Sequence, residues 1–115
     1  MLLNHSTALD NGARILLRLP HTSDRGPLAE LHERAGMVVD ELELSRLLRV
    51  VPRERIAVCA TSWVGGTHAL VGFASGRPGA VEPEVLLVAA PFAEQLGGLL
   101  TAALQERDVR RPHIA

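Results

Sequence analysis

The sequence contains no lysine and no tyrosine, and all twelve of its basic residues are arginine. Aromatic residues make up only 3% of the chain and the net charge is −1. Nucleic-acid binding requires more positive charge and more stacking side chains than this. The same balance gives no electrostatic attraction to an anionic membrane. The heavy use of arginine, alanine, glycine, leucine and valine is typical of a GC-rich bacterial coding sequence.

A single cysteine, Cys59, excludes an internal disulfide and any site built from several thiolates. The five histidines show no metal-ligand spacing, and the sequence contains no G-x-S-x-G motif, so we expect neither a metal site nor a serine-hydrolase elbow. The N-terminus lacks the features of a signal peptide, and no apolar run approaches the roughly 20 residues that span a bilayer. We therefore expect a cytoplasmic protein in which Cys59 is a buried, inert thiol.

What the sequence does contain is enough apolar surface for one core. The chain has 115 residues, of which 47% are hydrophobic and 22% are charged. These values are typical of one globular domain. We expect a flexible leader over residues 1–12, a single domain over residues 13–109 and a tail over residues 110–115.

Hydrophobic periodicity predicts a strand, two helices, three strands and a last helix, in that order. The expected ranges are a strand at 13–19, helices at 27–35 and 41–51, strands at 55–64, 69–76 and 84–89, and a helix at 93–107. Residues 22–24 offer candidate N-caps, Asp40 is the predicted N-cap of the second helix, and Gly36 is the predicted end of the first. Gly72, inside a strand, indicates a bulge or a close backbone approach.

The stretch from Pro83 to Arg107 is the main candidate for function. It contains a short apolar strand, a loop with a proline, and a helix predicted to open near Gly97-Gly98. Unpaired N–H groups and the positive end of the helix dipole meet at such a turn, which favours an anion. The alternative is that both glycines only shape the helix entry or allow close packing of the helix on the sheet.

Three segments resemble the GNAT superfamily, the N-acetyltransferases that use acyl-CoA. They are LPHTSDRGPLAELHERAG after the first strand, the hairpin RIAVCATSWVGGTHALVGFASG, and EVLLVAAPFAEQLGGLLTAAL. Together they cover about residues 13–107. The resemblance implies an α/β (layered α+β) fold with a mixed, mostly antiparallel sheet flanked by helices, in the order β-α-α-β-β-β-α. The chain ends before the C-terminal strands of that family.

The same resemblance implies an activity and a set of site residues. The expected activity is transfer of an acetyl group from acetyl-CoA to an amine of a small molecule or protein. Backbone groups of Val88, Ala89 and Ala90 would hold the pantetheine arm, and the turn would hold the pyrophosphate. The turn residues concerned are Gln95, Leu96, Gly97 and Gly98.

Glu84 is the best-placed carboxylate for a general base, and the alternative is a solvated glutamate at a strand end. A different class of function is also open, in which a non-catalytic module forms a homodimer or binds a partner. It would do so through the sheet edge left free where the family's further strands are absent.

Overall fold

The computed structural model describes residues 2–10, 12–49, 54–64, 66–80, 82–89 and 93–107. Its strands are β1 (Ser6–Ala8), β2 (Arg14–Arg18), β3 (Ile56–Val64), β4 (Thr67–Gly76) and β5 (Val85–Val88). Its helices are the short 3-10 helix η1 (Thr22–Asp24), α1 (Arg25–Arg34), α2 (Glu41–Leu48) and α3 (Ala93–Arg107). Within the described residues these strands form one sheet of order β1-β2-β3-β4-β5, in which every pairing is antiparallel. The predicted α+β fold class and element order are confirmed, with one strand added at the N-terminus. The sheet was predicted to be mixed, whereas the described strands pair only in the antiparallel sense, because no parallel strand follows β5 among the described residues.

The added strand lies in the segment predicted to be a flexible leader. Ser6–Ala8 pair with Arg14–Leu16, and the buried Leu9 packs into the core. The Asn-Gly turn signal at this point marks a hairpin rather than a boundary, and Gly12 has a φ of +87° as such turns require. A three-residue edge strand shows too little alternation for its sequence to reveal it. The predicted tail at 110–115 lies outside the described residues.

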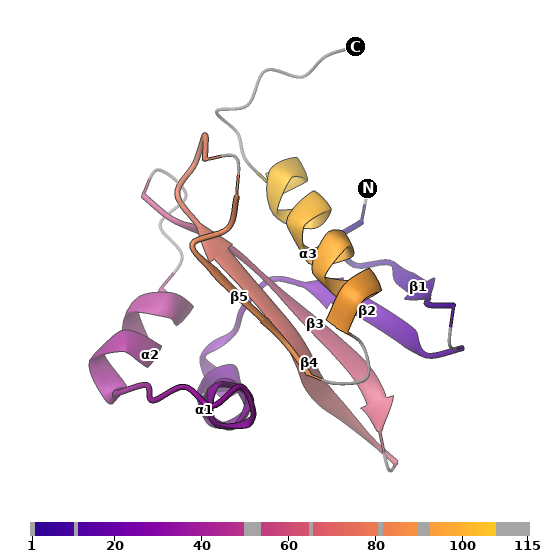
Figure 1. The fold of residues 1–115 in the computed structure, drawn as a ribbon, viewed down its shortest axis with the longest axis horizontal. Helices are drawn as coiled ribbons and strands as arrows, with labels where there is room; N and C mark the ends of the chain where they lie inside the picture. Colours follow the sequence, from indigo (N-terminus) through magenta and orange to yellow (C-terminus); the bar gives the residue numbers. More distant parts are fainter. Residues whose placement is uncertain are drawn as a thin grey trace.

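The sheet is covered on both faces (Figure 1). Helix α3 packs on one face, where alternate residues of β3 (Ile56, Val58 and Ala60) join its leucines in one core cluster. Helices α1 and α2 pack on the other face, against Ala57, Cys59, Phe73 and Leu87. Because neighbouring strand residues point to opposite faces, one strand supplies both cores.

Two of the predicted helix ends in the α1–α2 region are confirmed. The Asp40 carboxylate accepts a hydrogen bond of 2.8 Å from the Glu43 N–H and so caps α2. Gly36 follows α1 with a φ of +74°, the left-handed conformation expected just beyond a helix. Helix α2 ends at Leu48, and the backbone of Arg49 is extended, so the predicted extension of the helix to Val51 is wrong.

Gly72 confirms both readings of a glycine inside a strand. The β3–β4 register shifts at Ala60/Thr61, so that Val71 of β4 is the extra residue of a bulge. A Cβ atom on Gly72 would lie 2.8 Å from Leu100 Cδ1 and 3.1 Å from Leu96 Cδ2. Helix α3 therefore packs directly on the β4 backbone at this point.

Candidate functional site

Strand β5 forms one edge of the described sheet and pairs only with β4 there. The Ala89 N–H donates to the Val71 carbonyl at 2.8 Å, and Leu87 pairs with Phe73. Because backbone groups alternate in direction along an antiparallel strand, those of Leu86 and Val88 point away from β4. Val88 and Ala89 are half-buried against the core, and Ala90 lies outside the described residues. The end of β5 thus offers backbone donors and acceptors that β4 does not use.

Helix α3 begins at Ala93, which confirms the range 93–107 predicted from periodicity, whereas the anion-binding turn was placed one turn too late, at Gly97-Gly98. In an α-helix each N–H bonds to the carbonyl four residues before it. The N–H groups of Gly97 and Gly98 are therefore directed into the helix, and the unpaired N–H groups belong to the first turn, which includes Gln95. The two glycines therefore lie inside the helix and do not form the turn that leads into it.

The side chains of Gln95 and Leu96 differ in their surroundings. Gln95 is exposed, and its Oε1 accepts a hydrogen bond of 2.8 Å from the Asp10 N–H, which ties α3 to the β1–β2 hairpin. Leu96 is fully buried in the core beneath α3. Contact with a ligand at this turn would therefore involve the backbone near Leu96 and not its side chain.

Close packing does not explain Gly97 and Gly98. A Cβ atom on Gly97 would meet only Leu86 Cδ2, at an ordinary 3.9 Å, and one on Gly98 would meet nothing within 4 Å. Glycine inside a helix costs about 1 kcal/mol relative to alanine. The two residues therefore weaken α3 with no compensating gain in packing, and they leave its surface bare beside β5.

Glu84 lies immediately before β5, about 13 Å along the strand from Val88 at roughly 3.3 Å per residue. Its carboxylate oxygens are 3.3 and 3.4 Å from Nη2 of Arg55, a residue whose side chain is 10% exposed. Nη1 of Arg55 donates to the buried Ser75 hydroxyl at 2.9 Å. The Glu84 side chain is itself 43% exposed. Both oxygens of this carboxylate contact a buried cation and the side chain is still partly open to solvent, an arrangement that neither of the sequence-based interpretations of Glu84 included.

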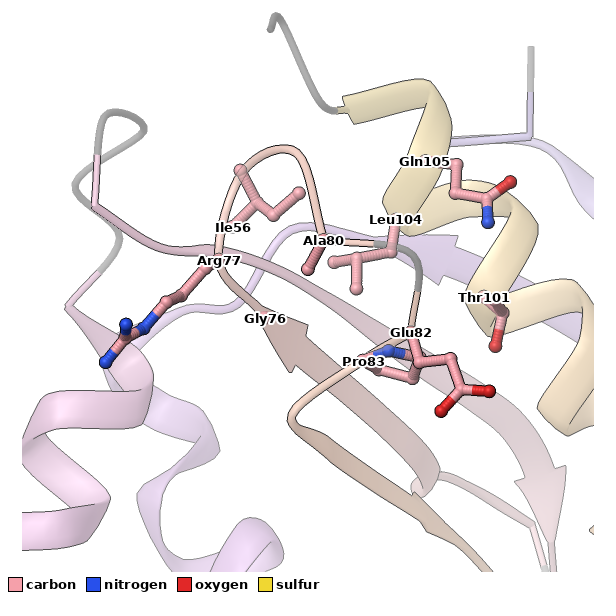
Figure 2. A pocket seen from close by; sticks show the side chains of 9 residues that line it. All are labelled: Ile56, Gly76, Arg77, Ala80, Glu82, Pro83, Thr101, Leu104 and Gln105. Carbon is pink, nitrogen blue, oxygen red and sulfur yellow. The ribbon is translucent and has the colours of Figure 1, made fainter. Parts of the chain in front are cut away.

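A small hollow, which Glu82 and Pro83 help to line, separates the β4–β5 connection from α3 (Figure 2). It is lined by Ile56, Gly76, Arg77, Ala80, Glu82, Pro83, Thr101, Leu104 and Gln105. Its volume of about 10 Å³ is close to the minimum for one water molecule. Figure 2 shows the Arg77 side chain turned away from α3. This hollow is too small to receive a substrate.

Sequence reasoning missed a buried charged cluster under α1. Arg18 makes two hydrogen bonds to the Asp24 carboxylate, at 2.7 and 2.8 Å, and the His21 N–H donates a third at 2.7 Å. Asp24 was predicted as a helix cap, but its side chain makes no cap hydrogen bond to α1. The alternation of β2 places Arg18 on the face opposite Ile15 and Leu17, which is the face that α1 and α2 cover. A sheet flanked by helices, as the sequence predicts, has no solvent-exposed face. A charged residue such as Arg18 on either face therefore needs a partner, and this was the signal for the ion pair.

The prediction that Cys59 is a buried, inert thiol agrees with its position in this cluster. Cys59 is fully buried, and its sulfur lies 3.8 Å from Asp24 Oδ2. Burial, and then the negative charge of Asp24, raise the pKa of the Cys59 thiol to about 12. We expect folded protein at pH 8 to react with a disulfide reagent at least about 100-fold more slowly than protein unfolded in urea. Equal reaction rates for folded and unfolded protein, measured by the absorbance of the thiolate that the reagent releases, would contradict this assignment.

Comparison with protein families and with curated proteins finds no match to this sequence. Among solved structures, the chain is similar to the GNAT domain of S. lividans PAT, with a TM-score of 0.60 and 16% sequence identity. The similarity covers 92% of this chain and 74% of that one. The fold is GNAT-like. At this identity the likeness shows the fold alone, and it agrees with the resemblance seen in the sequence.

The described residues contain neither a metal-binding cluster nor a membrane-spanning helix. No three His, Cys, Asp or Glu side chains there gather as they would around a metal ion. No described helix is long and apolar enough to cross a membrane. In that part of the chain, the end of β5 and the start of α3 stay the main candidate site.

Proposed function

We propose that the protein is an N-acetyltransferase that transfers the acetyl group of acetyl-CoA to an amine of a small molecule or protein. The observation that carries this proposal is the free edge of β5 leading into the start of α3 within a GNAT-like fold. A bacterial, cytoplasmic setting is part of the proposal and rests on composition and the single cysteine. No metal takes part in it.

The acyl donor would lie along β5 and end at α3. The pantetheine arm carries amides, and the outward backbone groups of Val88, with those of Ala89 and Ala90, are the proposed partners for them. The pyrophosphate would lie at the first turn of α3, near the unpaired N–H group of Gln95 and beside the backbone of Leu96. Gly97 and Gly98 would leave room for the coenzyme against the helix.

Glu84 would act as the general base. The amine nitrogen forms its bond to the thioester carbonyl carbon, its proton passes to the Glu84 carboxylate, and coenzyme A leaves as the thiol or thiolate. The ion pair with Arg55 would hold the carboxylate in place. Because Glu84 lies at the start of β5, the amine would enter from that end of the strand.

Binding of acetyl-CoA is the direct test of this proposal, and a substitution at Gly98 tests where the coenzyme binds. By calorimetry we expect Gly98→Glu to weaken binding by at least about tenfold, because it places bulk and negative charge against the pyrophosphate. Gly26→Glu is the matched control, since a Cβ atom there also meets nothing within 4 Å and the helix concerned is α1. No heat from the unchanged protein at high micromolar acetyl-CoA, as monomer or dimer, would refute the enzyme proposal.

The role of Glu84 has its own prediction. We expect Glu84→Gln to lower kcat by about 10² to 10⁴ while leaving acetyl-CoA affinity unchanged. Glu82→Gln, an exposed neighbour, is the control and should keep full activity. Arg55 loses its partner in the Gln variant, so the melting temperature must be measured beside the rate. An unchanged kcat would remove Glu84 from the mechanism.

The second candidate is a non-catalytic module that dimerises through β5. Leu86, on this edge strand, is 44% exposed, and β5 carries no charge or proline that would block pairing. A second copy and acetyl-CoA would need the same outward backbone groups, so they should compete. Sedimentation distinguishes the two candidates. If the module is non-catalytic and binds no acetyl-CoA, Leu86→Lys abolishes the dimer and added acetyl-CoA leaves it intact, whereas under the enzyme proposal acetyl-CoA dissociates a dimer formed through β5.

A further inference from the structure

A second hollow lies between the start of α1 and the last turn of α2. It is lined by Thr22, Arg25, Ser45, Leu48 and Arg49, and it opens to solvent with a volume of about 380 Å³. This size falls within the usual range for small-molecule sites. None of the residues proposed for acetyl-CoA or for proton transfer lines it. It lies on the α1–α2 face of the sheet, while α3 covers the other face (Figure 1).

The polar groups around this hollow favour an anion. Nη1 and Nη2 of Arg25 donate to the Ser45 hydroxyl at 3.1 and 2.7 Å, so the guanidinium is held in one orientation. A hydroxyl that accepts these bonds still has its own hydrogen to donate. Arg49, at the end of α2, is exposed. Two arginines, Arg25 and Arg49, and two hydroxyl-bearing residues, Thr22 and Ser45, thus line one space together with Leu48.

The nearby carboxylates do not cancel this positive charge. Asp24 is paired with Arg18. Glu41 lies 3.2 Å from Arg25, but its side chain is 80% exposed, and exposed pairs of this kind are weak. Within the part of the chain that the structure describes, no carboxylate pairs with Arg49. The space therefore keeps a net positive charge.

We propose that this hollow binds a small molecule that carries one oxyanion, a phosphate or a carboxylate, next to an apolar group. Guanidinium groups bind both oxyanions through paired hydrogen bonds. Arg25 and Arg49 would hold the anion, the Ser45 hydroxyl would donate to it, and Leu48 would contact the apolar part. This binding site is a separate proposal from acetyl transfer, and the result of a test of one does not decide the other.

The test is a titration of the full chain with phenyl phosphate and with benzoate, followed by amide NMR shifts. We expect saturable shifts at residues 22–25 and 45–49 with dissociation constants of about 1 mM or below. Tighter binding of one compound assigns the anion class. Benzyl alcohol, which has the ring without the charge, should cause no such shifts. Acetyl-CoA at saturation should leave the binding unchanged.

Two variants make the test decisive. Arg49→Gln should weaken binding about tenfold, and the exposed Arg34→Gln, at the far end of α1, should leave it unchanged. Arg25→Gln should weaken it as well, but it also removes a contact between α1 and α2, so Arg49 carries the conclusion. Absence of saturable shifts at these amides, or shifts that Arg49→Gln leaves unaltered, would overturn the proposal.

Discussion

Replacing Gly72 by alanine will destabilise the protein by about 1–3 kcal/mol, the usual cost of overpacking a full core. The added Cβ would stand 2.8 Å from Leu100 Cδ1 and 3.1 Å from Leu96 Cδ2. Both leucines are fully buried and cannot turn into solvent. The helix must therefore move away from the sheet or the leucines must adopt strained rotamers. Urea unfolding followed by circular dichroism measures the loss.

The same substitution at Gly98 is the matched control for Gly72→Ala. A Cβ atom on Gly98 meets nothing within 4 Å, so alanine there should stabilise α3 by about 0.5–1 kcal/mol. Leu100→Ala should cost less stability in the Gly72→Ala background than in the unchanged protein, because it relieves the overlap. Equal stability changes at Gly72 and Gly98 would contradict the packing seen here.

Replacing Asp24 by asparagine will cost about 2–4 kcal/mol at pH 7, because it leaves a largely buried arginine without its counter-charge. The Asp24 side chain is 5% exposed and that of Arg18 is 29% exposed. Partial contact of Arg18 with water keeps the expected loss below that of a fully buried pair. Asp40→Asn is the control, since that carboxylate is exposed and asparagine caps a helix equally well.

The effect of Asp24 should depend on pH with a definite sign. Burial alone would raise the pKa of the Asp24 carboxyl, but the hydrogen bonds from Arg18 and the His21 N–H outweigh it, so the pKa is lowered. A lowered folded-state pKa adds stability above the unfolded value of about 3.9, and this is lost as pH falls through the folded pKa. The difference in unfolding free energy between the unchanged protein and Asp24→Asn should therefore become smaller below about pH 4. A stability difference that stays constant between pH 7 and pH 3 would contradict the stabilising role of the Arg18–Asp24 ion pair.

Much of the fold could be predicted because most of its elements follow from local chemistry. Apolar spacing revealed α2, Asp40 and Gly36 marked helix ends, and Gly72 revealed a bulge. Strand β1 escaped because three residues show no period, and its pairing depends on β2 being an available edge. Apolar spacing also gave the range 93–107 of α3, but the turn proposed for the anion was placed at Gly97-Gly98 because glycine is a poor helix former.

The candidate site also has one part that the sequence predicted and another that depends on tertiary contacts. The sequence singled out Glu84 and the turn before α3, but it could not show that Glu84 is paired with Arg55, because the two residues are 29 positions apart. It also could not show that Arg25 and Arg49 border one hollow, since that depends on how α1 packs against α2.

By itself, the sequence determined the layered α+β fold, the order of most elements and the buried position of Cys59, because periodicity, caps and composition act over a few residues. The tertiary structure decided which polar groups meet. It placed Arg18 on Asp24 and Arg55 on Glu84, and it left the outward backbone groups of β5 without a partner strand in the described chain. Pairing of charges depends on contacts between segments far apart in the chain, and no local pattern records those contacts.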